Sequence, residues 1–152
     1  MNQDFLDLLT AFNDAETIYL IVGAYAVGVH GHPRATKDLD VWVDASPANA
    51  LRVMTALRSF GAPLDGVDQA DFERPGTGFM MGQPPRRIDV LTEISGVDFQ
   101  QAWPRRVRAN FADVPVHVIG FDDLLANKQK AGRDQDIADI RALERLRRVK
   151  QR

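Results

Sequence analysis

The chain has 152 residues, of which 45% are hydrophobic and 26% are charged, and its formal net charge is −2. These values fit one globular domain and exclude a protein whose overall charge would draw it to nucleic acid. The absence of cysteine excludes disulfide frameworks and thiolate metal sites. The sequence has neither a secretory signal nor an apolar run of roughly 20 residues, so we expect a cytoplasmic protein without a membrane segment.

The first sixty residues alternate between patterns typical of helices and of strands. They predict a helix over 3–13, a strand over 17–22, a short helix over 24–29, a strand over 38–44 and a helix over 48–60. The first of these strands is largely apolar and β-branched, which favours a strand covered on both faces. Ser46 and Pro47 supply an N-cap and a first-turn proline to the last helix, and Gly61 supplies its C-cap.

The second half opens with an irregular segment, 61–85, in which glycine and proline recur. There we expect a mobile loop around 75–78 and at most a short strand near 79–81. The remaining residues predict a strand over 87–91, a helical segment over 98–106, a strand over 114–119 and helices over 121–131 and 134–149. This order predicts a mixed α/β (α+β) fold, with a sheet of about four to five strands flanked by helices.

Asp38 and Asp40 point to the same face of their predicted strand, because successive side chains of a strand alternate between its two faces. The apolar residues between and after them point to the other face, which belongs to the core. Two neighbouring carboxylates are costly unless a cation neutralises them. Mg²⁺ held by carboxylates and substrate phosphates is a common solution, so the pair predicts a site for a divalent metal ion.

Gly23 and Asp89 extend this predicted site. Gly23 lies between a buried strand and a short helix, where its backbone can turn sharply and present amide groups to a phosphate. Asp89 lies on the third predicted strand, on the face opposite to the inward Ile88 and Val90. If this strand neighbours the strand of Asp38, three carboxylates surround one or two Mg²⁺ ions, as nucleotidyl or phosphoryl transfer requires.

Two segments of the first half, residues 23–31 (GAYAVGVHG) and 34–40 (RATKDLD), resemble the signature of the polymerase β-like nucleotidyltransferase superfamily. The likeness is greatest to a small bacterial branch, which includes minimal nucleotidyltransferases and the nucleotidyltransferase toxins of abortive-infection and toxin–antitoxin systems. Residues 128–139 (KQKAGRDQDIAD) resemble a C-terminal element of that branch. The resemblance implies one nucleotidyltransferase-like domain over 1–152, in which 121–152 form a C-terminal helical extension.

The resemblance also implies roles for single residues. Asp38, Asp40 and Asp89 would be the catalytic metal ligands, and Asp89 would also help to activate the incoming hydroxyl. Gly23 and Ala24 would form the phosphate-binding turn. The superfamily usually has serine or glycine at the position of Ala24, so any hold on phosphate at this turn must come from backbone amides.

Four basic residues complete the implied nucleotide site. Lys128 and Arg133 would reach the triphosphate from the C-terminal helices and stabilise developing charge. Arg34 and Lys37 lie beside the carboxylates, where they either bind phosphate or nucleic acid or neutralise Asp38. For Arg34 and Lys37 the sequence leaves both of these roles open.

The implied reaction is Mg²⁺- or Mn²⁺-dependent transfer of a nucleoside monophosphate from an NTP, such as ATP, to a hydroxyl group. The acceptor would be tRNA or another RNA, a protein, or a small molecule. In this branch the enzyme can be a toxin, whose partner is a cognate antitoxin. A different reading is a degenerate module that binds nucleotide or a partner protein without turnover, and Ala24 favours it.

Other residues are open to more ordinary interpretations. The basic stretch from Arg141 to Arg152 predicts a solvated helical face, or else a nucleic-acid-binding module whose affinity depends on salt. His30 follows an apolar helix, and we expect it to bond a backbone group rather than to act as a base. Trp42 shares the face of the aspartates, where it either stacks on a base or fills a rim.

Overall fold

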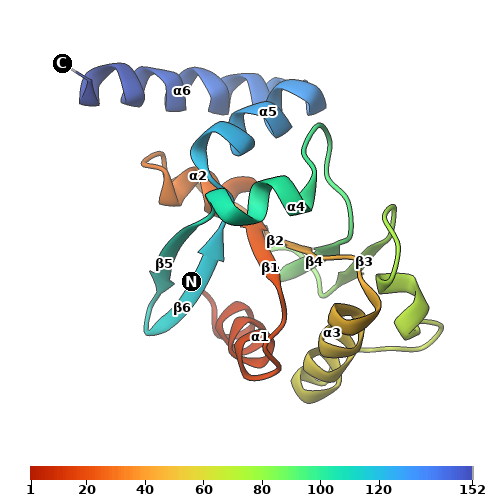
Figure 1. Cartoon of the computed structure of the whole chain (residues 1–152). Helices are drawn as coiled ribbons and strands as arrows, with labels where there is room; N and C mark the ends of the chain where they lie inside the picture. The colour runs from red at the N-terminus through yellow and green to blue at the C-terminus, as the bar shows by residue number, and fades with distance from the viewer. Residues whose placement is uncertain (152) are drawn as a thin grey trace.

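The computed structural model describes residues 1–151, which form one mixed β-sheet of six strands packed by helices (Figure 1). The helices are α1 (Gln3–Asp14), α2 (Gly23–Val29), α3 (Pro47–Phe60), α4 (Phe99–Ala102), α5 (Phe121–Ala131) and α6 (Asp134–Lys150), with the 3-10 helices η1 (Gln69–Phe72) and η2 (Trp103–Arg105). The strands are β1 (Tyr19–Val22), β2 (Asp38–Val43), β3 (Gly78–Met81), β4 (Arg87–Leu91), β5 (Val107–Phe111) and β6 (Val114–Val118).

The α+β class is confirmed, and most predicted elements begin and end close to their observed bounds. The predicted caps of α3 are confirmed as well. The Ser46 side chain accepts a hydrogen bond from the Asn49 amide at 3.3 Å. Gly61 ends the helix with a φ of 88°, a left-handed conformation that glycine adopts without strain.

The prediction of four to five strands was too low, because β5 was missed. Its residues are at most half-buried, and its register pairs it with β6 alone, so the strand lacks a continuous apolar run. The irregular segment 61–85 also holds more structure than expected, namely η1 and β3. Pairing with β4 forms β3 despite its glycine-rich surroundings. The helical segment predicted over 98–106 divides into α4 and η2 at Trp103.

The strand order is β3-β4-β2-β1-β6-β5. At the centre, β1 pairs with β2 in antiparallel fashion, while β2–β4 and β1–β6 are parallel pairs. The two outer strands, β3 and β5, are each antiparallel to their neighbour. The parallel pairing of β2 with β4 brings Asp40 opposite Asp89, although 49 positions separate them in the chain.

The two faces of the central strands differ in character. Leu39, Val41 and Val43 are fully buried on one face, which α1 and α3 cover (Figure 1). Phe12 of α1 packs there against Tyr19, with 5.6 Å between the ring centroids. The aspartates of β2 lie on the other face, as the alternation of a strand requires. The apolar core therefore fixes which side of the sheet carries the charged groups.

One apolar residue of α3, Leu51, is 53% exposed. Among residues 1–151 no helix combines the length and the apolar character that crossing a bilayer requires. Arg152, the last residue of the predicted basic stretch, lies outside the described residues.

Candidate active site

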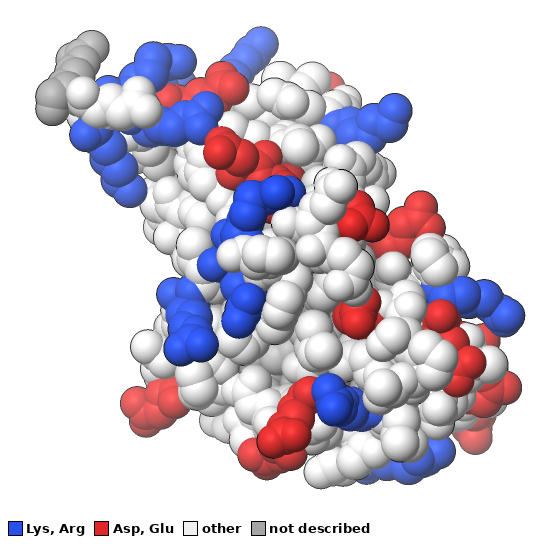
Figure 2. Space-filling view, in the orientation of Figure 1, with Lys and Arg blue, Asp and Glu red and all other residues white. Residues whose placement is uncertain are grey.

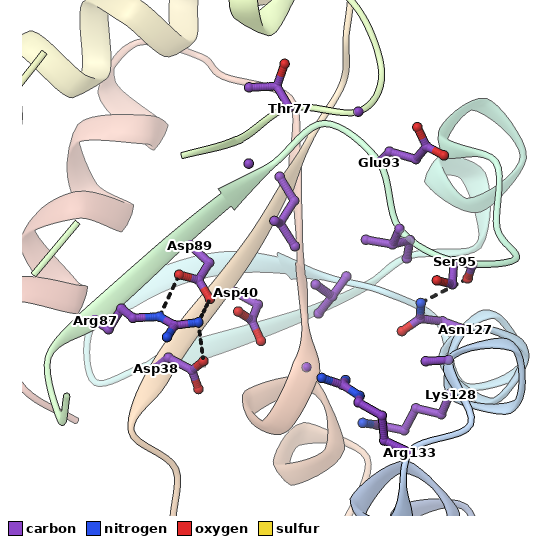
Figure 3. Close-up of a pocket in the computed structure, with 17 residues that line it drawn as sticks. Asp38, Asp40, Thr77, Arg87, Asp89, Glu93, Ser95, Asn127, Lys128 and Arg133 are labelled. Carbon is purple, nitrogen blue, oxygen red and sulfur yellow. Dashed lines mark hydrogen bonds and ion pairs between the residues drawn. The ribbon is translucent and has the colours of Figure 1, made fainter. Parts of the chain in front are cut away.

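Three carboxylates converge on the open face of the sheet. Asp38 and Asp40 lie on β2, and Asp89 lies on β4 directly opposite Asp40. One carboxylate oxygen from each residue lies within 4.8 Å of the others. The three side chains line a cavity of about 760 Å³ (Figure 3). Oxygen donors at this spacing are the chemistry that Mg²⁺ and Mn²⁺ prefer, so the donor set fits a divalent ion.

Arg87 neutralises part of this cluster. Its guanidinium donates to both oxygens of Asp89, each at 2.9 Å, and lies 3.7 Å from Asp38 Oδ2 (Figure 3). Arg87 stands two positions before Asp89 on the same strand, so both side chains share one face. A carboxylate has about four lone-pair sites, so Asp89 can accept this pair of hydrogen bonds and still bind a cation. The Arg-x-Asp spacing on a strand is the feature of the sequence from which this pair could have been predicted.

The pKa of Asp40 reflects its burial among other carboxylates. Burial raises its pKa to about 8, and the negative charges of Asp38 and Asp89 act in the same direction, while Arg87 opposes them. At neutral pH the carboxyl of Asp40 therefore keeps its proton most of the time when no other cation is present. A divalent ion at the same point would favour the carboxylate form instead.

Gly23 begins α2 at the end of the strand that pairs with β2. Its φ is 68°, a left-handed conformation. A Cβ at this position would overlap the Oδ2 atom of Asp40, so a side chain is excluded for steric reasons too. The backbone of this turn therefore lies directly against one of the three carboxylates, and Gly23 lines the same cavity.

Lys128 and Arg133 line the cavity from the opposite side, as Figure 3 shows. The Lys128 ammonium is buried and contacts Asp136 Oδ1 at 3.1 Å and Asp139 Oδ2 at 2.9 Å. Arg133 Nε contacts Asp136 Oδ2 at 2.7 Å, but 78% of the Arg133 side chain stays exposed. The charge of Lys128 is thus matched by two carboxylates, whereas the exposed Arg133 has donors left for a ligand.

The two acidic partners are held ionised by these contacts. Burial acts to raise the pKa of Asp136 and of Asp139, but hydrogen bonds from basic side chains outweigh it and lower both below the usual range. For Asp139 the first of these donors is Arg34, whose guanidinium binds both oxygens at 2.9 and 3.0 Å. This pair fastens α6 to the segment that leads into β2.

The structure separates the sequence-predicted residues into two groups. Those that line the cavity are Gly23, Asp38, Asp40, Asp89, Lys128 and Arg133. Arg34 is not among the lining residues, and it pairs with Asp139 rather than with Asp38. Lys37 is exposed, lies outside the lining, and forms no ion pair with the described residues. Ala24, next to Gly23 in α2, is also outside the lining.

The structure shows the surroundings of two aromatic residues, His30 and Trp42. His30 Nε2 lies 2.8 Å from the Ile119 carbonyl oxygen, so the prediction of a backbone-bonded histidine is confirmed. Trp42 does share the face of the aspartates, but it is 2% exposed and packs edge-on against Phe99 of α4. It therefore offers no open ring face on which a base could stack.

A separate basic region lies along α6. Figure 2 shows Lys and Arg side chains gathered at the upper left, where Figure 1 places the C-terminal part of this helix. Arg145, Arg148 and Lys150 are exposed there. The helix begins beside Arg133, and its 17 residues span about 25 Å. This surface is therefore far from the three carboxylates.

A comparison with protein families identifies the chain. The model of the family described as "Nucleotidyltransferase of unknown function (DUF6036)" matches residues 2–150. No curated protein is significantly similar to the chain. The matched region contains the three carboxylates, the glycine turn and the three basic residues of the cavity. The chain therefore belongs to this DUF6036 family of nucleotidyltransferases.

Proposed function

We propose that this protein is a metal-dependent enzyme that transfers a nucleoside monophosphate from an NTP to a hydroxyl group. The observation that carries the proposal is the convergence of Asp38, Asp40 and Asp89 within one cavity. These three residues would hold one or two Mg²⁺ or Mn²⁺ ions. The bound metal would supply Lewis-acid polarisation of the α-phosphate and charge neutralisation at the leaving group.

The chain's own residues divide the remaining work. The hydroxyl oxygen of the acceptor forms a bond to the α-phosphorus, and the bond from that phosphorus to the β-phosphate oxygen breaks. Pyrophosphate leaves with the electron pair of that bond. The hydroxyl proton passes to the carboxylate of Asp89, whose geometry Arg87 fixes by binding both of its oxygens. No oxidant or reductant is needed.

The triphosphate lies between the glycine turn and the C-terminal helices. Arg133 contacts it directly, because its side chain is exposed toward the cavity and keeps free donors. Lys128 acts as a positioning residue for Asp136 and thereby for Arg133, since its own charge is matched by two carboxylates. At the turn, contact with phosphate comes from backbone amides, because Ala24 has no hydroxyl.

The acceptor is an RNA, a protein or a small molecule that offers a hydroxyl group. A toxin that modifies tRNA or a cellular protein, and that a cognate antitoxin restrains, is the biological setting that the resemblance favours. Controlled expression in a bacterial host tests this setting. Growth arrest with the wild-type chain, and normal growth with Asp38→Asn, is the expected result.

The biochemical test is transfer of label from α-labelled NTPs in Mg²⁺, with and without candidate acceptors. The wild-type chain should transfer label and release pyrophosphate, whereas Asp38→Asn should not. Asp65→Asn is the matched control, because Asp65 is an exposed carboxylate outside the cavity. Equal transfer by the wild type and Asp38→Asn would falsify the proposed mechanism.

One observation favours a second candidate, a degenerate module that binds nucleotide without turnover. Arg87 already supplies a cation to Asp89 and Asp38, so these carboxylates have a partner without any metal. Calorimetry separates the two candidates. A degenerate module binds NTP with the same affinity in Mg²⁺ and in EDTA, whereas the proposed enzyme needs the metal for tight binding.

A further inference from the structure

The cavity of the candidate active site has a part that the metal ligands and the phosphate-binding residues leave free. Its wall there comes from the turn after β4 and from α5, and Ser95 and Asn127 lie on the side away from Asp89 (Figure 3). In the proposed reaction the α-phosphate lies at the three aspartates, and the remaining phosphates contact Arg133. The nucleoside would then occupy the free part of the cavity.

The turn after β4 packs closely against α5. Ile94 and Val97 form a β-bridge that closes this turn. Between them, Gly96 has a φ of 76°, and a Cβ atom there would lie 2.8 Å from the Cβ of Lys130. A side chain would not fit at this distance, so the backbone of the turn lies directly on the helix. This part of the wall is therefore formed before a ligand binds.

A hydrogen bond between the two elements fixes the orientation of the Asn127 side-chain amide. Its Nδ2 atom donates to the Ser95 carbonyl oxygen at 2.9 Å. Only the nitrogen of an amide can donate, so Oδ1 has to point the other way. Figure 3 shows this oxygen turned away from Ser95 and toward the cavity. Oδ1 accepts no hydrogen bond from residues 1–151, so its two lone pairs are free for a ligand.

The side chains around this oxygen are mostly apolar. Leu91, Ile94 and Ala131 line the same cavity, and each is partly buried. Asn127 and Ala131 are four positions apart on α5, so they lie on one face of the helix. Apolar walls accept the flat faces of a ring, and a single polar group of fixed direction then distinguishes rings that differ at one atom.

The nucleobases differ in the chemistry of one exocyclic group. Adenine and cytosine carry an amino group, which donates hydrogen bonds, where guanine and uracil carry a carbonyl oxygen, which accepts them. An acceptor that is held in one orientation attracts the amino group and repels the oxygen. An asparagine that could turn freely would present its oxygen to one class and its nitrogen to the other, and it would not discriminate.

We propose that Asn127 selects the base of the NTP, and that the site prefers adenine and cytosine to guanine and uracil. The inference rests on the proposed nucleotidyl transfer and narrows its nucleotide substrate. Asn127 is the specificity-determining residue, because its Oδ1 accepts a hydrogen bond from the exocyclic amino group. Ser95 positions Asn127 through its carbonyl oxygen, and the close packing at Gly96 keeps that carbonyl in place.

The test compares ATP with ITP, whose base has a carbonyl oxygen in place of the 6-amino group of adenine. Calorimetry with the full chain in Mg²⁺, without an acceptor, measures both affinities. We expect ATP to bind about ten-fold more tightly, because ITP loses a hydrogen bond and leaves two oxygens opposed. CTP and UTP form a second pair with the same difference, and CTP should bind more tightly by a similar factor.

Two variants assign the preference to one side chain. Asn127→Leu has nearly the same volume but no acceptor, and it should bind ATP and ITP with equal affinity. Asn110→Leu is the matched control, because Asn110 is exposed on β5 and lies outside the cavity, and it should keep the preference in full. Equal binding of ATP and ITP by the wild type, or a preference that survives in Asn127→Leu, would overturn the inference.

Failure of this inference is distinguishable from failure of the proposed function. Binding of the four NTPs to the wild-type chain is measured first in Mg²⁺ and in EDTA. If no NTP shows Mg²⁺-dependent binding, the proposed nucleotidyl transfer is wrong and its base preference with it. If the four NTPs bind with Mg²⁺ but with equal affinity, only the assignment of the base is wrong.

Discussion

Two clusters of charged side chains face each other across the candidate active site, and they are balanced in opposite ways. On the sheet, three carboxylates, Asp38, Asp40 and Asp89, have one guanidinium between them, that of Arg87. On the C-terminal helices, two carboxylates have three basic partners, which are Arg34, Lys128 and Arg133. One cluster is therefore short of positive charge, and the other has more than it needs.

The difference suits the sheet cluster to binding a ligand and the C-terminal cluster to stabilising the fold. The C-terminal cluster satisfies its buried acids completely, and its excess positive charge resides on the exposed Arg133. The sheet cluster leaves Asp40 protonated at neutral pH for want of a cation. The proposed metal–triphosphate complex would correct both imbalances at once, because its cation would neutralise the carboxylates and its phosphates would accept hydrogen bonds from Arg133.

The largest expected effect comes from removing a carboxylate from the sheet cluster, which tests whether this cluster serves activity rather than stability. Asp38→Asn should lower nucleotidyl transfer by about 100-fold or more, because one ligand to the metal is lost. It should change the unfolding midpoint in urea little, because Asp38 is partly exposed, lies 3.7 Å from Arg87, and accepts a hydrogen bond from the Thr36 hydroxyl that the amide oxygen of asparagine can still accept. A large loss of stability with activity retained would reverse the assignment of the two clusters.

The corresponding substitution in the C-terminal cluster should lower stability more than it lowers activity. Asp139→Asn leaves Arg34 and the buried Lys128 without one of their charged partners. We expect a loss of about 3 kcal/mol in the free energy of unfolding, measured in urea. Asp122→Asn is the control, because its pair with Arg147 is solvent-exposed and should contribute less than about 1 kcal/mol.

The pH dependence of the protein's stability tests whether the sheet cluster lacks positive charge, and it needs no change in the shape of the cavity. In EDTA, the raised pKa of Asp40 means that the folded chain binds more protons than the unfolded chain between about pH 4 and pH 8. The stabilisation is complete below the ordinary carboxyl pKa and is lost as the pH rises through 8. The melting temperature in EDTA should therefore fall over this interval relative to that of Asp40→Asn.

Added Mg²⁺ should oppose this fall, because the metal stabilises the carboxylate form that high pH produces. The same measurement at pH 8 with and without Mg²⁺ checks it. If the melting curves of the wild type and Asp40→Asn run parallel from pH 5 to pH 8, then Asp40 carries no unusual proton.

The smallest expected effect concerns Arg87, whose positive charge lies against Asp89 and Asp38 and would repel a metal ion bound to the same carboxylates. Arg87→Gln should raise the affinity for Mn²⁺ by about three- to ten-fold and lower the stability of the metal-free chain. Arg86→Gln, at the exposed neighbouring position, should change neither. Calorimetric titration of the two variants measures the difference. A weaker Mn²⁺ affinity in Arg87→Gln would mean that the guanidinium supports the metal rather than replacing it.

What the sequence could predict was mainly what depends on local geometry. The alternation of a strand sufficed to put Asp89 opposite to Ile88 and Val90, and glycine after a buried strand sufficed for the turn at Gly23. The partner of Arg34 could not be predicted in this way, because 105 positions separate it from Asp139. Pairing across such a distance depends on how the layers pack, which no local pattern encodes.

The same reason explains the other discrepancies. Lys128 lines the cavity, but its pairing with two aspartates was not predicted, because that pairing depends on how α5 packs against α6. The strand β5 has only a modest apolar content and forms because β6 offers a free edge. The turn after β4, with Ser95, carried no motif, and its place in the wall of the cavity became visible only in the fold.

The contact between Gly23 and Asp40 has a consequence for how the protein can vary. Every residue other than glycine would push the Asp40 carboxylate aside and would also strain a left-handed backbone. A substitution at this turn would therefore disturb the proposed phosphate-binding backbone and the proposed metal ligand Asp40 together. A saturation library should find position 23 intolerant of all nineteen replacements, while the adjacent Ala24 accepts serine and glycine.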